Sequence, residues 1–241
     1  MSMTGAPVIY GIIPHTDSTE QKHPLGTTGV TNDGRTYRYG QAASTKLVLG
    51  KMCIAPDITT HHEDIAVNTF AIGDKSITAT LGATAITGNE YQEGFVNVTD
   101  GTGQGIMYKI KSCPATALSS DVIITLEEPI IVAAEAATTV TLYRNKYRDI
   151  IVSDGTQADL PVGVPNIDIA ADSYGWFQVG GPCSVLVDAN DTTVGTPITI
   201  GDGTAGGVET HNAATEVLVG IQPAGAGADV GEYGVFELTL N

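Results

Sequence analysis

Two histidines followed by two acids, His61-His62-Glu63-Asp64, make up the segment with the clearest capacity for chemistry. Imidazole and carboxylate groups are common ligands of Zn²⁺ and related ions. Adjacent residues on an extended chain point in opposite directions, so these four converge on one ion only if the tertiary structure adds a partner such as His211. The pattern therefore favours a solvated polar loop, and we predict no metal and no cofactor. A hydrolase built on the two histidines is the enzymatic alternative.

Two glycine-rich segments, Asp100–Gly105 and Asp202–Gly207, share the glycine content of phosphate-binding loops. A P-loop requires GxxxxGK[ST] between a strand and a helix, and the dinucleotide fingerprint requires a βαβ unit, so neither motif is satisfied. The chain has no Gly-x-Ser-x-Gly elbow to present a nucleophilic serine. We interpret both loops as turns between strands and predict that the protein is not an enzyme.

Basic residues are scarce, and several of them stand beside tyrosines. Arginine and tyrosine are both enriched where proteins bind one another. If residues 143–148 form a strand, its period of two places their three cations on one face. Such a patch would recognise an acidic partner, or it would neutralise the protein's own carboxylates. The candidate partner contacts are Arg35, Tyr37, Arg38 and Tyr39 in one cluster, and Tyr143, Arg144, Lys146, Tyr147 and Arg148 in the other.

The charge balance is strongly acidic, with 11 Lys and Arg against 27 Asp and Glu and a formal net charge of −16. Because nucleic-acid binders place cations on phosphates, and anionic membranes also attract cations, we expect direct contact with neither. Three cysteines, Cys53, Cys113 and Cys183, are odd in number and widely spaced. This spacing predicts free thiols that pack as small apolar groups.

Runs of Val, Ile, Thr and aromatic residues, separated by Gly, Asp and Asn turns, predict the elements that must position these groups. Residues 1–34 contain several prolines and little periodicity, which is typical of an extended arm. Its apolar side chains, Tyr10, Ile12 and Ile13, are further candidate partner contacts. We predict a mainly β fold: a β-barrel or β-sandwich core, an inserted second β module and an extended N-terminal arm.

The predicted domain boundaries come from an internal similarity between two segments of the chain. An aromatic strand, a small-residue loop and an aliphatic strand follow one another from Tyr37 and again from Trp176. Two segments with one pattern fit neighbouring strand pairs of a single barrel or sandwich. We therefore predict a discontinuous core of residues 35–66 plus 150–241, with residues 67–149 inserted.

The segment from Leu25 to Lys51 combines a Gly-Thr lead-in, an Asp-Gly-Arg turn, a Tyr-Arg-Tyr strand, a small-residue loop and a Leu-rich strand ending in glycine. This run resembles one near the N-terminus of head decoration (cement) proteins of tailed bacteriophages. The resemblance implies a non-enzymatic structural virion protein that binds the major capsid protein and stabilises the head. It also implies attachment at symmetry or quasi-symmetry axes of the head, where such proteins are frequently homotrimers.

The strong acidity fits a position on the outer capsid surface of the virion, away from packaged DNA, after synthesis in the host cytoplasm. The alternative is a receptor- or glycan-binding β module of a phage tail or fibre. Such a module needs exposed aromatic platforms, whereas only 6% of the residues are aromatic and one is tryptophan.

Overall fold

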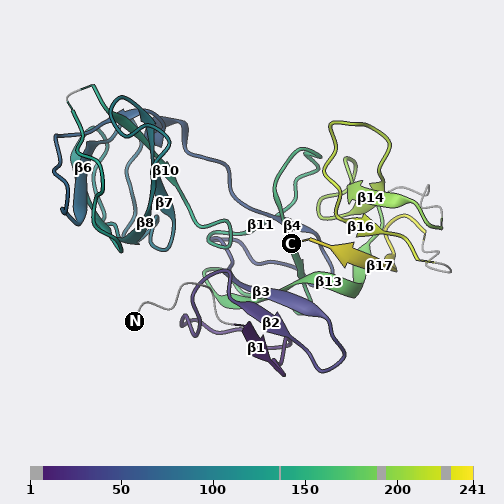
Figure 1. The fold of residues 1–241 in the computed structure, drawn as a ribbon. Helices are drawn as coiled ribbons and strands as arrows, with labels where there is room; N and C mark the ends of the chain where they lie inside the picture. Colours follow the sequence, from purple (N-terminus) through teal and green to yellow (C-terminus); the bar gives the residue numbers. More distant parts are fainter. Residues whose placement is uncertain (1–7, 136, 189–193, 224–228, 241) are drawn as a thin grey trace. The chain divides into compact units, whose positions relative to one another are not determined.

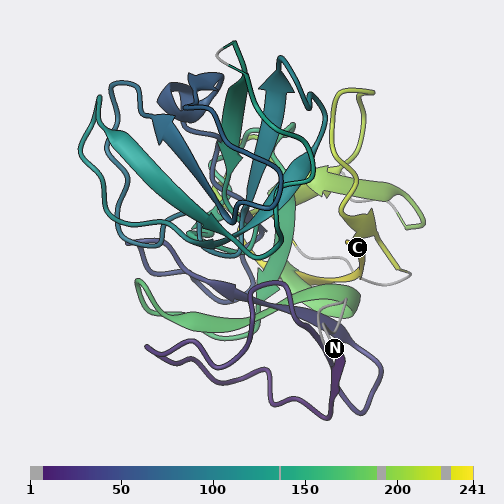
Figure 2. The same cartoon turned by 60° about the vertical axis from the view of Figure 1, so that its left-hand side comes forward.

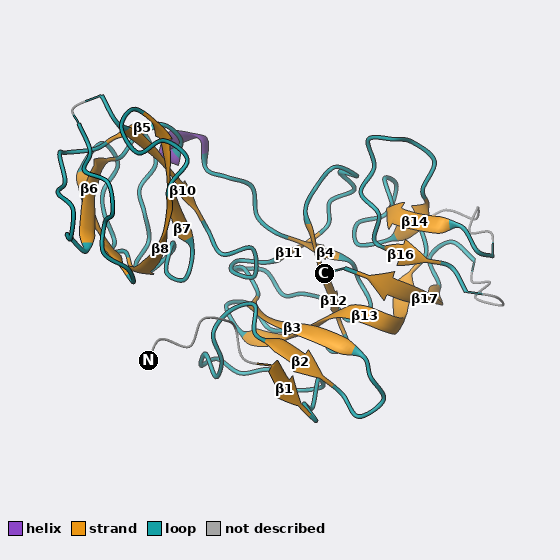
Figure 3. Ribbon diagram, in the orientation of Figure 1, coloured by secondary structure: helices purple, strands orange, loops and turns teal. Residues whose placement is uncertain are grey.

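The computed structural model describes residues 8–135, 137–188, 194–223 and 229–240, and it divides the chain into two compact units (Figure 1). Unit 1 comprises Met1–Pro56 and Lys146–Asn241, and unit 2, Asp57–Asn145, is inserted into it. Strands dominate both units, which confirms the predicted β fold class (Figure 3). Within the described ranges, no helix has the length and apolar character needed to cross a membrane.

Unit 1 is organised around one large sheet. Neighbours along its main path are β1 (Val8–Tyr10), β2 (Thr28–Val30), β3 (Thr36–Gln41), β13 (Tyr174–Leu186), β17 (Tyr233–Thr239), β16 (Gly220–Ile221), β14 (Pro197–Ile200) and β15 (Val208–Thr210). Three further strands join off this path: β4 (Cys53–Ile54), β11 (Ile151–Val152) and β12 (Pro161–Pro165). Between these strands the pairing is antiparallel except for β1 with β2, and two isolated bridges, Ala42–Ile150 and Val187–Val208, are parallel.

The long strand β13 connects two parts of this sheet. Its first half pairs with β3, and its second half, from Gly180 onward, pairs with β17. Gly181 has a φ of +85°, a conformation that glycine adopts without steric cost. Trp176 in the first half packs with Tyr37 and Tyr39, whereas the second half contributes to a separate aliphatic core. The strand therefore changes its pairing partner from β3 to β17 at Gly180.

Two short strands of the N-terminal segment join this sheet, although the sequence predicted an extended arm. β1 runs parallel to β2, and β2 forms a hairpin with β3. The Asp33-Gly34 turn closes this hairpin, with Gly34 at a φ of +87°. The prolines did not prevent strand formation, because Pro14 and Pro24 lie in the connection between β1 and β2 and not within either strand.

The unit boundaries also differ from the predicted domain boundaries. Residues 57–66, predicted to lie in the core, belong to unit 2, because β5 (Ile65–Ala66) pairs with β10 (Thr139–Tyr143). Residues 146–149 belong to unit 1. The predicted Leu-rich strand is reduced to a single bridge between Leu47 and Ile169. Local strand patterns do not specify which sheet a short edge segment joins.

Unit 2 is a nearly closed barrel, whose strands curve around one interior in both ribbon views (Figures 1 and 2). Its order is β5, β10, β7 (Phe95–Asp100), β8 (Met107–Ser112), β9 (Asp121–Leu126) and β6 (Ser76–Thr80). A bridge between Val67 and Ala79 brings the two edges together. Burial alternates along β7, β8 and β9, so every second side chain faces one apolar core. Asp100–Gly105 is the β7–β8 turn, as predicted.

Candidate partner-binding surfaces

The outer edge of β1 exposes two large apolar side chains. Tyr10 is 78% exposed, and Val8 is 50% exposed. The Gly11 N–H donates to the Val30 carbonyl of β2 at 2.8 Å. Because successive N–H groups of a strand point to opposite edges, the Tyr10 N–H faces away from β2. Among the described residues no strand pairs with this edge, so it offers backbone hydrogen-bonding groups beside exposed apolar surface.

The other two apolar residues predicted in the arm lie differently. Ile13, just beyond β1, is 68% exposed. Ile12 is half-buried and packs against the aromatic cluster of Tyr37, Tyr39 and Trp176. The structure therefore leaves Ile13 accessible to a partner and uses Ile12 to fix the N-terminal segment on the sheet.

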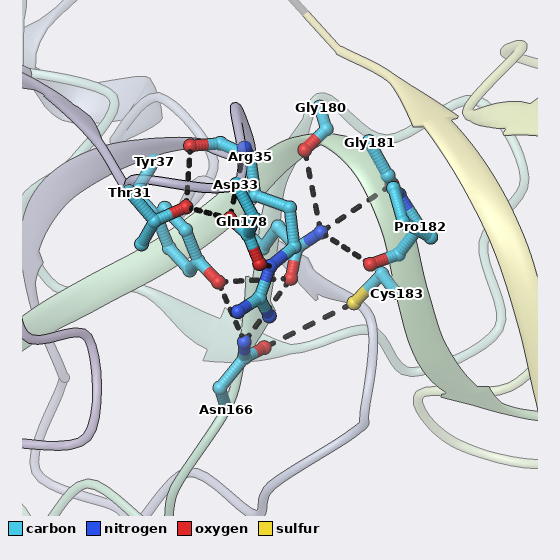
Figure 4. Close-up of polar contacts among 10 residues, drawn as sticks. All are labelled: Thr31, Asp33, Arg35, Tyr37, Asn166, Gln178, Gly180, Gly181, Pro182 and Cys183. Atoms are coloured by element: carbon cyan, nitrogen blue, oxygen red, sulfur yellow. Dashed lines mark hydrogen bonds and ion pairs between the residues drawn. The ribbon is translucent and has the colours of Figure 1, made fainter.

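A polar network fills the bend of β13 beside the β2–β3 hairpin (Figure 4). The fully buried Gln178 directs its amide nitrogen at three carbonyls of the bend, those of Gly180, Gly181 and Pro182, at 2.9–3.3 Å. Its amide oxygen accepts from the Tyr37 hydroxyl at 3.2 Å and from Asn166 Nδ2 at 3.1 Å. One buried amide thus contacts three successive backbone carbonyls of β13 and uses its own hydrogen-bonding groups within the interior.

Arg35 lies over this network. Its Nε donates to Asp33 Oδ2 at 2.8 Å, and its guanidinium lies 5.9 Å from the centre of the Tyr37 ring. The Arg35 side chain is 26% exposed, whereas Tyr37 is fully buried. Of these two predicted contacts, Arg35 is accessible to a partner, whereas Tyr37 is buried beneath the Arg35 guanidinium.

A pocket of about 220 Å³ opens at this place, and we call it the Arg35 pocket. Burial raises the pKa of the Tyr37 hydroxyl to about 12, and it raises the pKa of the Cys183 thiol to about 12 as well. Both groups are therefore neutral at pH 7, and Arg35 supplies the permanent positive charge. The lining residues are His15, Arg35, Leu49, Gly50, Pro165, Asn166, Gln178, Pro182, Cys183 and Ser184.

The neighbouring Arg38 and Tyr39 make contacts within unit 1. Arg38 Nη1 donates to the Gly26 carbonyl at 3.2 Å, and Tyr39 is only 3% exposed. Tyr39, Trp176 and Tyr174 form one wall of a small pocket of about 90 Å³. Because Tyr39 and Trp176 are nearly buried, this wall offers little aromatic surface for stacking against a sugar.

The second Arg–Tyr cluster does not form one strand, so the condition under which its three cations would share one face is not met. β10 ends at Tyr143, which is half-buried, and the boundary between the units follows Asn145. Arg144 remains in unit 2, whereas Lys146 and Arg148 belong to unit 1. The period of two fails because the chain leaves the sheet before the cations are reached.

Arg144 pairs with a buried carboxylate of its own unit, Glu90. Burial by itself would raise the pKa of Glu90, but the Thr87 N–H and the Arg144 guanidinium outweigh it and hold that pKa below its usual value. This pair is the local neutralisation that the sequence left as an alternative to partner recognition.

The remaining members of the second cluster lie near one another in unit 1. Lys146 Nζ lies 5.0 Å from the centre of the Tyr147 ring, and burial lowers the pKa of that lysine. Arg148 is 8% exposed and donates to Gln41 Oε1 at 3.1 Å. Lys146 and Tyr147 also line a hollow of about 200 Å³ together with exposed leucines. Lys146 is therefore the member of this group that a partner reaches most directly.

The histidine pair is divided between surface and core. His62 is fully buried in unit 2, with Nδ1 2.6 Å from the Tyr91 hydroxyl and Nε2 3.0 Å from the Thr84 carbonyl oxygen. His61 is exposed, and its Nδ1 lies 2.7 Å from Thr84 Oγ1. Both ring nitrogens of His62 are occupied within the barrel, so His62 anchors the segment before β5.

An acidic cluster in unit 1 is not evident from the sequence. Asp188, Asp202 and Glu209 each place a carboxylate oxygen within 4.8 Å of the others, and they are the one group among the described residues whose spacing could hold a metal ion. Burial, followed by repulsion from Asp202 and Asp188, raises the pKa of Glu209 to about 6. Oxygen ligands of this kind suit a hard divalent cation. The Asp202–Gly207 loop is the available signal, but its glycine content by itself indicates only a turn.

Comparison with family models, curated proteins and solved structures finds no match for this chain. Function is therefore inferred from the surfaces themselves and from the sequence features of Leu25–Lys51.

Proposed function

We propose that this protein is a non-enzymatic structural component of a phage virion, which binds the outer surface of the capsid and stabilises the head. The observation that carries the proposal is the outer edge of β1, with exposed Val8 and Tyr10 and no strand paired to it among the described residues. The resemblance of Leu25–Lys51 to head decoration proteins supports it, because that segment contains the β2–β3 hairpin on which β1 lies.

The proposed mechanism is the addition of a capsid strand to this edge. Backbone hydrogen bonds to an exposed sheet edge supply affinity, and the side chains on either side supply specificity. Tyr10 and Ile13 would add apolar contact area next to the new strand pair. A protein attached in this way to two or more capsid subunits raises the cost of separating them.

The partners proposed are the major capsid protein and further copies of this chain, as a homotrimer at a symmetry axis. The net charge of −16 favours a site outside the shell, because packaged DNA would repel so acidic a surface. The alternative, a glycan-binding module of a tail or fibre, gains little support from the aromatic wall, since Tyr39 and Trp176 are nearly buried.

Two substitutions at one residue test the edge. Tyr10→Thr removes the aromatic ring, and Tyr10→Pro removes both the ring and the outward N–H. Proline is tolerated on edge strands, so both variants should fold. We expect Tyr10→Thr to weaken binding to heads purified without this protein by a few-fold, and Tyr10→Pro to weaken it at least tenfold more. Co-sedimentation with the heads measures both.

Equal binding by the two variants would show that no strand is added at β1. Failure of the unmodified protein to bind these heads, together with binding to purified host-surface glycans, would replace the capsid proposal with the tail or fibre alternative. Sedimentation velocity of the free protein tests the trimer, for which we expect three times the mass of the 24.9 kDa chain.

A further inference from the structure

We propose that the Arg35 pocket receives the carboxylate side chain of an aspartate or glutamate from a partner polypeptide. This binding preference belongs to unit 1, and it holds whether or not the partner is a phage capsid. It follows from three properties of the pocket: the free donors of Arg35, the size and polarity of the cavity, and the apolar strip beside it.

The first property is the geometry of the guanidinium. Asp33 accepts from Nε, and the Nη atoms of Arg35 make no hydrogen bond to the described residues. A guanidinium presents its donors as a planar fork that matches the two oxygens of a carboxylate. Asp33 is therefore a partial partner, which leaves donors at the pocket for a second carboxylate.

The second property is the size of the site. The cavity volume of about 220 Å³ is below the roughly 300–1,000 Å³ typical of pockets for drug-sized ligands. It fits one side chain better than a cofactor. The protein's net charge of −16 opposes the approach of a polyanion such as nucleic acid, but a single acid on a polypeptide surface meets much less repulsion.

The third property is an exposed apolar strip that adjoins the pocket. Leu49 is 49% exposed, Tyr233 46% and Val235 48%. A Cβ placed on Gly50, which lines the pocket, would lie 2.6 Å from the Tyr233 ring, so this ring covers the pocket's edge. In the sheet, Val235 is directly opposite Ser184, another lining residue. The surface therefore suits an acid flanked by apolar residues.

Short peptides test this preference on the full-length protein. The probe is acetyl-Leu-Glu-Leu-amide, with acetyl-Leu-Gln-Leu-amide and acetate as controls, and binding is followed by the side-chain amide NMR signals of Asn166 and Gln178. We expect the Glu peptide to shift these signals and to bind about tenfold more tightly than either control. Comparison with the Gln peptide measures the contribution of the carboxylate, and comparison with acetate measures the contribution of the apolar flanking residues.

Three variants assign the site. Arg35→Gln should weaken the Glu peptide about tenfold, whereas Asp33→Asn, which removes the competing carboxylate, should strengthen it. Lys22→Gln is the matched control, because it also removes a cation from an exposed ion pair, that with Glu20, and Lys22 does not line the pocket. It should bind the peptide as the unmodified protein does.

Several results would overturn the proposal. Equal affinity for the Glu and Gln peptides would show that the pocket does not recognise a carboxylate. Acetate binding as tightly as the Glu peptide would show that the pocket does not prefer a polypeptide partner. An unchanged affinity in Arg35→Gln, shown to be folded by an unaltered melting curve, would assign the binding to another site.

Discussion

The sharpest prediction of the structure is that the two adjacent histidines differ greatly in what their replacement costs. His62→Ala removes a fully buried ring from the barrel of unit 2, and His61→Ala removes an exposed one. The substitutions are chemically identical and one residue apart. Any difference between them therefore reports the position of the ring and not its chemistry.

The size of the effect follows from the two hydrogen bonds and the ring packing of His62. His62→Ala leaves the half-buried Thr84 carbonyl without its N–H donor, which costs about 1–2 kcal/mol. The hydrogen bond to Tyr91 contributes about 1 kcal/mol more. The edge-to-face packing of the two rings, with centroids 5.5 Å apart, adds about 0.5–1.5 kcal/mol. We expect a total loss of about 2.5–4.5 kcal/mol in the free energy of unfolding, against less than about 0.5 kcal/mol for His61→Ala.

Two probes separate the units in a thermal melt. Each kcal/mol lowers the melting temperature of a domain of this size by about 4–8 °C, so the unit 2 transition of His62→Ala should fall by at least about 10 °C in calorimetry. The chain's one tryptophan, Trp176, lies in unit 1, so the change in its fluorescence should keep its midpoint. His61→Ala should change neither signal.

Equal destabilisation by the two substitutions would refute this reasoning, because it would mean that both rings act together. A shared metal is the direct explanation of such a result. A fall in the melting temperature of the unmodified protein on adding a chelator, lost in both variants, would establish it.

Three further outcomes are expected. Deleting residues 1–24 removes β1 and the packing of Ile12 against Trp176. The tryptophan emission should therefore shift to longer wavelength, and unit 1 should melt several degrees lower. Unchanged emission and melting would mean that the segment is not part of the sheet. Burial raises the pKa of Glu209 to about 6, so the stability that goes with its protonated form is fully present below about pH 4.5 and is lost as the pH rises through about 6. Glu209→Gln should therefore raise the free energy of unfolding at pH 7.5 by roughly 2 kcal/mol at most, seen as a higher melting temperature, and change neither at pH 4. The opposite pH dependence would contradict the shift. Buried thiols with raised pKa values should resist a thiol reagent until unfolding, and reductant should not move the melting temperature; rapid labelling of the native protein would contradict this for Cys53, Cys113 and Cys183.

Several features of the fold could be predicted because they depend on neighbours in the chain. Alternating apolar residues predicted the strands around Ile77, Val96 and Ile110, since a period of two places one face of a strand in a core. The Asp33-Gly34 turn followed from glycine's access to positive φ. These patterns also specified the mainly β class and the turn role of Asp100–Gly105.

The sequence by itself thus determined many of the strands and turns, the acidic character and the absence of a recognisable catalytic motif. Only the tertiary structure decided how side chains distant in sequence meet. Most of the residues that line the Arg35 pocket are more than a hundred positions away from Arg35, and Asp188 meets Glu209 because the residues before them, Val187 and Val208, form a bridge. His61 and His62 look equivalent in the chain, yet only one enters the barrel. Burial and contact depend on the path of the whole backbone, and no local pattern encodes that path.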